Sequence, residues 1–268
     1  METEFNLNLV VITSHDYMFF ASRDYGAVAY PSDIVGNYAL MYAVNRGTSG
    51  VTRVASGTTP YYDEDMVKMN TYATPGAPTE QFPYQGTGTT SANGGRWLLR
   101  ETRIGSKTIP SWDAASISRI TWNSIGETLL DIMTRDRLNL PKVGAYFKHA
   151  PLRSFYFYTI GKDIPQVIRL GKKHTSVRCS VFPLKPKLAF GTFRPTCPVN
   201  TIDLPEQTRI LQGSILTIPP SPVIVDAELD GAHLSAVDSH GYIHRVPIPD
   251  RAKYLRVFGS ERQETIHG

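Results

Sequence analysis

Residues 164–181 contain a dense group of cationic side chains, which makes this segment the strongest candidate in the sequence for binding a charged partner. The segment reads IPQVIRLGKKHTSVRCSV, and its positive or titratable side chains are Arg169, Lys172, Lys173, His174 and Arg178. Five such side chains within ten residues suit a polyanionic partner better than an apolar one. The alternative is an ordinary solvated basic loop, and this stretch alone does not decide between the two interpretations.

The same segment predicts the elements that would present these cations. Pro165 marks a turn into a short apolar stretch, and Gly171 interrupts the charged residues. Beyond His174 the residues alternate in character as far as the apolar pair Val181 and Phe182. This pattern predicts a pair of strands, or a strand followed by a turn, with the cations along one edge.

No established catalytic signature accompanies the cations. The sequence has no P-loop, no GxGxxG after a strand, no HExxH and no GxSxG. His240 and His244 are four residues apart, but the β-type sequence around them argues against a helical zinc site. We therefore expect no bound metal or cofactor.

A metal-independent ribonuclease stays an alternative, because such an enzyme does not require a fixed sequence motif. A histidine would act as acid or base, a lysine would stabilise the charged intermediate, and a tyrosine would position the 2′-hydroxyl. The side chains available for these roles are His15, Tyr17, Lys148, His149 and His174. Nothing in the sequence brings them together.

Composition is typical of soluble globular proteins. Hydrophobic residues make up 41% and charged residues 19% of the chain, and no apolar run reaches the roughly 18 residues of a membrane helix. The first residues include two acids and no basic segment, which argues against a signal peptide. Cys179 and Cys197 form neither a disulfide framework nor a CxxC metal site. We expect a cytoplasmic protein with no membrane partner.

Charge is distributed unevenly along the chain. Residues 1–95 hold 4 Lys/Arg and 9 Asp/Glu, a net charge of −5, whereas residues 96–178 hold 15 and 6, a net charge of +9. Residues 179–268 hold 9 of each. A basic middle beside an acidic start predicts two surfaces with different partners, one of which is a polyanion.

The elements expected before the basic segment begin with a strand over residues 4–13, which becomes continuously apolar and should lie centrally in a sheet. Ile34, Tyr38 and Met41 have the i, i+4, i+7 spacing of an amphipathic helix, predicted over residues 34–46. A strand, an aromatic and basic loop and a helix would form the first βα unit of a ferredoxin-like or RRM-like domain.

Residues 47–115 are less regular. Residues 74–95 contain three prolines and five glycines, which predicts a long loop or the tip of a hairpin. Strands are predicted on either side, at residues 66–73 and 96–104. We interpret residues 47–115 as an arm inserted into the core, and a disordered linker between domains is the alternative.

The rest of the chain reads mainly as strands. The FYFY sequence predicts a strand over residues 155–160, and frequent prolines after residue 183 predict edge strands with tight connections. These short strands are expected at residues 215–218, 223–229, 242–246 and 254–258.

Five short stretches occur in a characteristic order: FFASRDYG at 19–26, NYALMYA at 37–43, YATP at 72–75, IPSW at 109–112 and IPQVIRLGKKHTS at 164–176. Together they resemble the Cas-five-type subunit of type I-D CRISPR Cascade, the Csc-one family in the RAMP superfamily of RNA-binding proteins. Each stretch alone is weakly specific, and the specificity comes from their order. The C-terminal third carries no matching motif, and residues 76–95 depart in length from the family pattern.

The resemblance implies an α+β fold with an RRM-like or ferredoxin-like (RAMP) core and an inserted β-hairpin thumb. We expect one domain over residues 1–268, with the arm at 47–115 and a β-rich C-terminal extension at 183–268. It also implies a non-catalytic subunit that binds the 5′ handle of the CRISPR RNA (crRNA) in antiviral defence. The expected neighbours are the Cas-seven-type backbone subunit, the Cas-ten-type large subunit and PAM-proximal target DNA, while a separate Cas-six-type enzyme would cut the precursor RNA.

A single-stranded handle requires cations for its phosphates and flat side chains for its bases. The cations of residues 164–181 are the predicted phosphate contacts. Arg23 and Tyr25 follow the first strand, where a handle could cross the sheet, and a local pair of Arg23 with Asp24 is the alternative. Lys107 and Trp112 at the base of the arm could clamp and stack, and a core position for Trp112 is equally consistent.

Three functions therefore stay open at this point. The first is a structural RNA-binding subunit, the second is a metal-independent endoribonuclease that processes CRISPR repeat RNA, and the third is a protein–protein adaptor without RNA contact.

Overall fold

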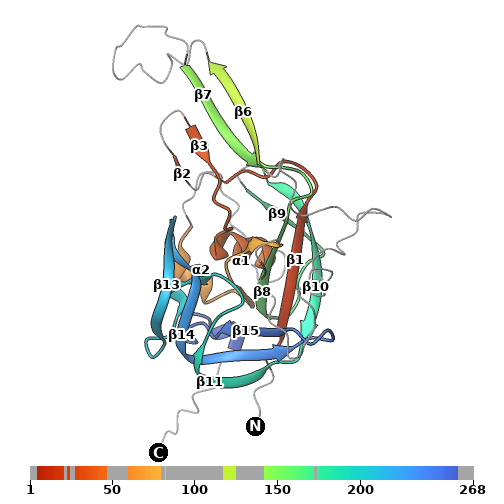
Figure 1. The fold of residues 1–268 in the computed structure, drawn as a ribbon. Helices are drawn as coiled ribbons and strands as arrows, with labels where there is room; N and C mark the ends of the chain where they lie inside the picture. Colours follow the sequence, from red (N-terminus) through yellow and green to blue (C-terminus); the bar gives the residue numbers. More distant parts are fainter. Residues whose placement is uncertain are drawn as a thin grey trace, which may run out of the picture.

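The computed structural model describes residues 5–20, 23–24, 28–46, 60–79, 82, 117–124, 142–171 and 174–258. In this part of the chain most strands are antiparallel and the helices are few and short (Figure 1). The predicted α+β fold holds in this coarse form, with strands dominant. No helix among the described residues is long and apolar enough to cross a membrane.

A six-stranded sheet contains most of the hydrophobic core. Its strands are, in order, β4 (Thr71–Ala73), β8 (Ser154–Gly161), β1 (Leu7–Ser14), β10 (Thr175–Leu184) and β9 (Val167–Leu170), and β5 (Ala77–Pro78) also pairs with β8. The first strand is central, as its position in the chain predicted, and it is antiparallel to both neighbours. Every residue of β8 is buried, which explains its apolar and aromatic FYFY sequence.

The predicted first helix is α1 (Asn37–Asn45), which buries Leu40, Met41 and Val44. It begins three residues later than expected because Val35 instead exchanges two backbone hydrogen bonds with Gly76, each 2.8 Å long. The side chain of Asn45 fastens the end of the helix to β4: Nδ2 donates to the Thr71 carbonyl (2.7 Å), and Oδ1 accepts from the Thr71 N–H (3.0 Å).

Part of the segment predicted as an arm lies in the core. Within residues 47–115, the described residues 60–79 form α2 (Tyr62–Met66) and the strands β4 and β5, both buried against β8. The strand predicted over residues 66–73 is therefore confined to its last three residues. These residues join the sheet because β8 would otherwise present an unpaired and apolar edge.

The projecting part of the described structure comes later in the chain. Strands β6 (Ile117–Ser124) and β7 (Lys142–His149) form an antiparallel hairpin that extends away from the six-stranded sheet (Figure 1). β3 (Val28–Tyr30) pairs in parallel with β7, and β2 (Arg23–Asp24) pairs with β3.

The C-terminal part builds a five-stranded sheet around one long strand, β14 (Ser221–Val237). Its partners are β11 (Lys187–Phe193), β12 (Val199–Asn200), β13 (Arg209–Ile218) and β15 (Ile243–Pro247). Asp230 in the middle of β14 pairs with Thr192 of β11 and with Arg209 of β13, so these two strands lie on opposite sides of it.

The strand predicted over residues 254–258 is wrong, because this segment is the short helix α4 (Leu255–Phe258). The Val257 N–H donates to the Tyr254 carbonyl (3.0 Å), and Tyr254 is buried. Phe258, four residues on, places its ring 6.1 Å from that of Phe5. Tyr254 and Phe258 are four residues apart and thus have the spacing of one helix face. Over so short a segment, the sequence pattern does not distinguish this spacing from the alternation of a strand.

A buried carboxylate joins the N-terminal and C-terminal parts. Asp203, at the end of the 3-10 helix η3 (Thr201–Asp203), accepts hydrogen bonds from Asn37 Nδ2 (2.5 Å), Tyr38 Oη (3.2 Å), Tyr72 Oη (3.4 Å) and Tyr254 Oη (2.6 Å). Burial raises the pKa of Asp203, while the hydrogen bonds from Tyr254, Asn37 and Tyr38 oppose the rise. We call Asp203 and these four donors the carboxylate junction.

Candidate nucleic-acid interface

The basic segment folds as an antiparallel hairpin at the edge of the six-stranded sheet. In the register of β9 with β10, Arg169 lies opposite Ser176, and Arg178 lies opposite Val167. Ile168 and the other core-facing residues are buried, whereas Val167, Arg169 and Arg178 are exposed. The predicted strand pair is therefore confirmed, and its two described arginines share the solvent face.

The turn of this hairpin has a tightly constrained backbone. Gly171 has φ +75° and His174 has φ +51°, and the His174 N–H donates to the Gly171 carbonyl (3.1 Å). Nη1 of Arg169 donates to the His174 carbonyl (3.1 Å), which holds the guanidinium over the turn. A Cβ at position 171 would lie 2.7 Å from the Phe19 carbonyl oxygen, so only glycine fits there.

The loop after β1 adjoins this turn and adds an aromatic ring. Thr175 Oγ1 donates to the Tyr17 carbonyl (2.9 Å), and the His15 N–H donates to the Ser176 carbonyl (3.3 Å). The Tyr17 side chain is 39% exposed, and Nζ of Lys148 lies 5.6 Å from the centre of its ring. Cations and an exposed ring therefore lie in adjoining segments, the combination that single-stranded nucleic acid requires.

We call Arg169, His174, Arg178, Tyr17 and Lys148 the basic surface. Tyr17 and Lys148 were not among the predicted RNA contacts. They meet because Met18 exchanges backbone hydrogen bonds of 3.1 and 2.9 Å with His149, a pairing that no local sequence pattern reveals.

His149 is buried and is a structural residue. A guanidinium nitrogen of Arg153 lies 2.8 Å from His149 Nδ1, and because arginine only donates, Nδ1 is the acceptor. Burial, followed by the charge of Arg153, lowers the pKa of His149 to about 4. Of the residues considered for a ribonuclease, His15, Tyr17, Lys148 and His174 remain near the surface in adjoining segments.

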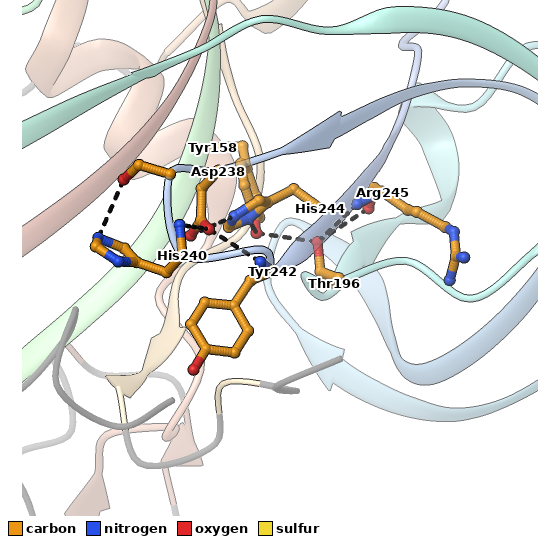
Figure 2. Close-up of polar contacts among 8 residues, drawn as sticks. Tyr158, Thr196, Asp238, His240, Tyr242, His244 and Arg245 are labelled. Carbon is orange, nitrogen blue, oxygen red and sulfur yellow. Dashed lines mark hydrogen bonds and ion pairs between the residues drawn. The ribbon is translucent and has the colours of Figure 1, made fainter. Parts of the chain in front are cut away.

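His244 and His240 do not form a metal site. Figure 2 shows His244 between Tyr158, which donates to Nδ1 (2.8 Å), and Asp238, which accepts from Nε2 (3.2 Å). Both ring nitrogens are thus occupied, and Thr196 donates to the Tyr158 hydroxyl (2.9 Å) to complete a chain that fastens β8 to β15. Among the residues that the structure describes, no group of three or more metal-ligating side chains occurs.

Several predicted contacts cannot be placed on this surface. Arg23 lies in β2, where it pairs with Tyr30 through the backbone. The predicted contacts that fall outside the described residues are Tyr25, Lys107, Trp112, Lys172 and Lys173.

The fold and the surface together define a class: a mainly antiparallel β protein that presents a basic edge hairpin beside an exposed aromatic ring. The sequence model of the family described as Type I-D CRISPR-associated protein Cas5/Csc1 matches residues 5–257, and the chain belongs to this family. The resemblance found in five short stretches is thereby confirmed, and the match also covers most of the C-terminal third. The protein is CRISPR-associated and of type I-D.

Remote similarities to two solved structures accompany this match. A chain in the cryo-EM structure of the Type III-B Cmr-beta bound to cognate target RNA and AMPPnP aligns with TM-score 0.40 and 10% identity, over 83% of this chain and 86% of that one. A CRISPR protein from Archaeoglobus fulgidus aligns with TM-score 0.35 and 9% identity, over 89% of this chain and 99% of that one. No curated protein sequence matches the chain significantly.

Proposed function

We propose that this protein is a structural RNA-binding subunit of the type I-D CRISPR Cascade surveillance complex and that it binds the 5′ handle of the crRNA without cutting it. The observation that carries the proposal is the solvent face of the β9–β10 hairpin, on which Arg169 and Arg178 stand together beside the turn at His174. Family membership supports the CRISPR setting, and the hairpin supports the contact with RNA.

The basic surface has the parts that a single strand needs. The hydrogen bond from Arg169 to the His174 carbonyl uses one N–H group, and the guanidinium has further N–H groups for a phosphate. The exposed ring of Tyr17 offers a platform for a base, and each stacked base contributes about 1–3 kcal/mol. Lys148 beside that ring adds a second cation next to the stacked base.

We further propose that the subunit bridges the Cas-seven-type backbone subunit and the Cas-ten-type large subunit near PAM-proximal target DNA. The opposite net charges of residues 1–95 and 96–178 support separate surfaces for protein and RNA. In this proposal the six-stranded sheet with α1 is the RAMP core, and the projecting β6–β7 hairpin takes the place of the thumb.

The test is the salt dependence of handle binding by the full-length protein in its complex. Replacing both arginines (Arg169→Gln with Arg178→Gln) should weaken binding of crRNA, because two phosphate contacts are lost. The slope of log K against log salt should become shallower by about 1.4, since each contact to a single strand contributes about 0.7.

A matched control removes the same charge elsewhere. Lys185→Gln with Lys187→Gln changes two exposed cations, one in the connection from β10 to β11 and one at the start of β11, and should leave the slope unchanged. If the arginine variant keeps the wild-type slope, the hairpin does not hold the RNA. If ultraviolet irradiation of the assembled particle also gives no crosslink between the protein and crRNA, the adaptor function is favoured.

A second candidate is supported by one observation, the placement of His15, Tyr17, Lys148 and His174 in adjoining segments. These are the residue types of a metal-independent ribonuclease. Incubating the pure protein with CRISPR repeat RNA in EDTA separates the two functions. Specific cleavage that is lost in both His15→Ala and His174→Ala would favour the enzyme, and intact RNA would favour the structural subunit.

A further inference from the structure

A cavity of about 420 Å³ lies between the segment that precedes α1 and the β13–β14 sheet. Its volume is within the range of roughly 300–1,000 Å³ that is usual for ligand pockets. Apolar walls are provided by Ile34, Tyr156, Leu216 and Val225, and two carboxylates, Asp33 and Asp226, line it as well. We call this cavity the acidic pocket.

Asp226 reaches the acidic pocket through an irregularity in β14. The register of β13 with β14 shifts around Gln212, and Asp226 has φ +52°, a conformation that aspartate tolerates better than most residues. A bulge of this kind breaks the alternation of a strand and re-aims a side chain. Asp226 is exposed, and it lies next to Val225 in the pocket wall.

The carboxylate of Asp226 differs from its neighbours on the same strand. Glu228 pairs with Arg194 (3.5 Å), and Asp230 pairs with Arg209. Among the described residues, Asp226 has no ion-pair partner in the structure. Glu228 and Asp230 are therefore paired with arginines within the sheet, whereas Asp226, at the cavity, can pair with a cation from outside the protein.

Asp33 is held in place from behind. Its Oδ1 accepts from Nη2 of Arg153 (3.1 Å), whose side chain is only 5% exposed, while the Asp33 side chain is 51% exposed. A carboxylate has about four lone-pair sites, so this contact leaves capacity for a second donor. The pocket thus combines one carboxylate fixed by a buried arginine with another positioned by a bulge.

We propose that the acidic pocket binds an arginine or lysine side chain of a partner protein. The apolar walls suit the aliphatic stem of such a side chain, and the two carboxylates suit its charged head. RNA does not suit this pocket, because its phosphates would be repelled by the Asp226 carboxylate, which has no ion-pair partner among the described residues. The pocket is therefore a protein-contact site separate from the basic surface.

The probe is the tripeptide Ac-Ala-Arg-Ala-NH₂, and its uncharged counterpart is Ac-Ala-Gln-Ala-NH₂. Saturation-transfer difference NMR with the full-length protein measures weak binding of each. We expect saturation of the arginine side-chain protons in the first peptide and a dissociation constant at least about fivefold weaker for the second, because one solvent-accessible charge pairing is lost.

The informative variant is Asp226→Asn, which keeps the shape and the tolerance of positive φ but removes the charge. It should weaken binding of the arginine peptide about fivefold. Asp163→Asn is the matched control, because Asp163 is also exposed and has φ +65° but does not line the pocket. This control should bind the peptide like the wild type.

Three results would overturn the proposal: equal binding of the two peptides, unchanged binding by Asp226→Asn, or an equal loss in Asp163→Asn. Free putrescine tests the source of the cation. If putrescine binds more tightly than the arginine peptide, the site takes a small diamine and the partner-protein assignment is wrong. Asp226→Asn should leave the salt dependence of RNA binding unchanged, so this site and the proposed RNA contact can fail separately.

Discussion

The basic surface and the carboxylate junction use charged and polar side chains in opposite ways. On the basic surface, Arg178 and His174 are exposed to water, which solvates them whether or not a ligand is bound. In the junction, Asp203 is buried, and four side-chain donors replace the water that it has lost. Replacing an exposed charged side chain should therefore have little effect on stability. Replacing a buried one also removes the hydrogen-bond partner of every group that contacts it, and so should be strongly destabilising.

The same contrast applies to residues of one type. His174 lies in an exposed turn, while His244 is buried between Tyr158 and Asp238 with both nitrogens occupied (Figure 2). Arg178 faces solvent, while Arg153 is buried between His149 and Asp33. Residue type alone thus says little about role, and the burial of each side chain separates the proposed binding groups from the structural ones.

The largest expected effect is at the junction. Asp203→Ala removes the carboxylate that accepts from the hydroxyls of Tyr38, Tyr72 and Tyr254 and from the amide of Asn37, and should lower the free energy of unfolding by about 3–5 kcal/mol. Urea denaturation followed by circular dichroism measures this. Asp250→Ala, at an acid that is not part of the junction, is the control. A loss below about 1 kcal/mol for Asp203→Ala would show that the junction does not hold the two parts together.

The next effect is a dependence on pH. The pKa of His149 is lowered from 6.5 to about 4, so the unfolded chain binds its proton more readily between these values. The contribution of His149 to stability is present above pH 6.5 and is lost as the pH falls toward 4, a change of about 3 kcal/mol.

The variant His149→Gln tests this, because its amide oxygen can still accept from Arg153 but does not titrate. The rise in unfolding free energy from pH 4 to 6.5 should be smaller in this variant than in the wild type. Equal slopes in the wild type and His149→Gln would contradict the burial of a neutral imidazole.

A smaller effect is expected at the hairpin turn. Gly171→Ala places a Cβ 2.7 Å from the Phe19 carbonyl at φ +75°, which should destabilise the protein by about 1–2 kcal/mol and also weaken RNA binding by displacing the turn. Gly36→Ala is the control, because nothing lies within 4 Å of a Cβ there. Thermal unfolding measures both variants. Equal melting temperatures for Gly171→Ala and Gly36→Ala would mean that the turn is not closely packed against the loop after β1.

The smallest effect on stability is expected on the solvent face of the hairpin. Arg178→Gln should change the free energy of unfolding by less than about 0.5 kcal/mol, because the side chain is exposed. It should nevertheless make the salt dependence of RNA binding shallower by about 0.7. If Arg178→Gln lowered the free energy of unfolding as much as Asp203→Ala, the contrast between the basic surface and the carboxylate junction would be wrong, because the arginine would then be a structural residue.

Local patterns predicted what local forces determine. Alternation of polar and apolar residues gave the β9–β10 hairpin, and the apolar run of β1 gave its central position. The helix at residues 37–45 followed from side-chain spacing, although its start was set by the pairing of Val35 with Gly76, which is distant in sequence. The Pro- and Gly-rich composition of residues 74–95 gave no sign that Ala77 and Pro78 would pair with β8.

The features that sequence could not predict depend on residues far apart in the chain. Asp203 receives donors from residues 37, 38, 72 and 254, so no window of sequence contains the junction. Tyr17 meets Lys148 only because Met18 pairs with His149. Asp226 falls in a segment predicted as an ordinary strand, and neither the shifted register of β13 with β14 nor its place in the cavity wall has a local sequence signal.

The buried guanidinium of Arg153 affects how the basic surface and the acidic pocket coexist in one small protein. Its contacts run from Asp33, at the acidic pocket, to His149, whose backbone joins the segment that bears Tyr17. By countering the Asp33 carboxylate inside the protein, it weakens the negative field of this exposed acid, a field that physiological salt screens over about 8 Å. Arg153 acts as an internal counterion to Asp33, so that this acid would repel a polyanion at the proposed basic surface less strongly than an unpaired carboxylate would.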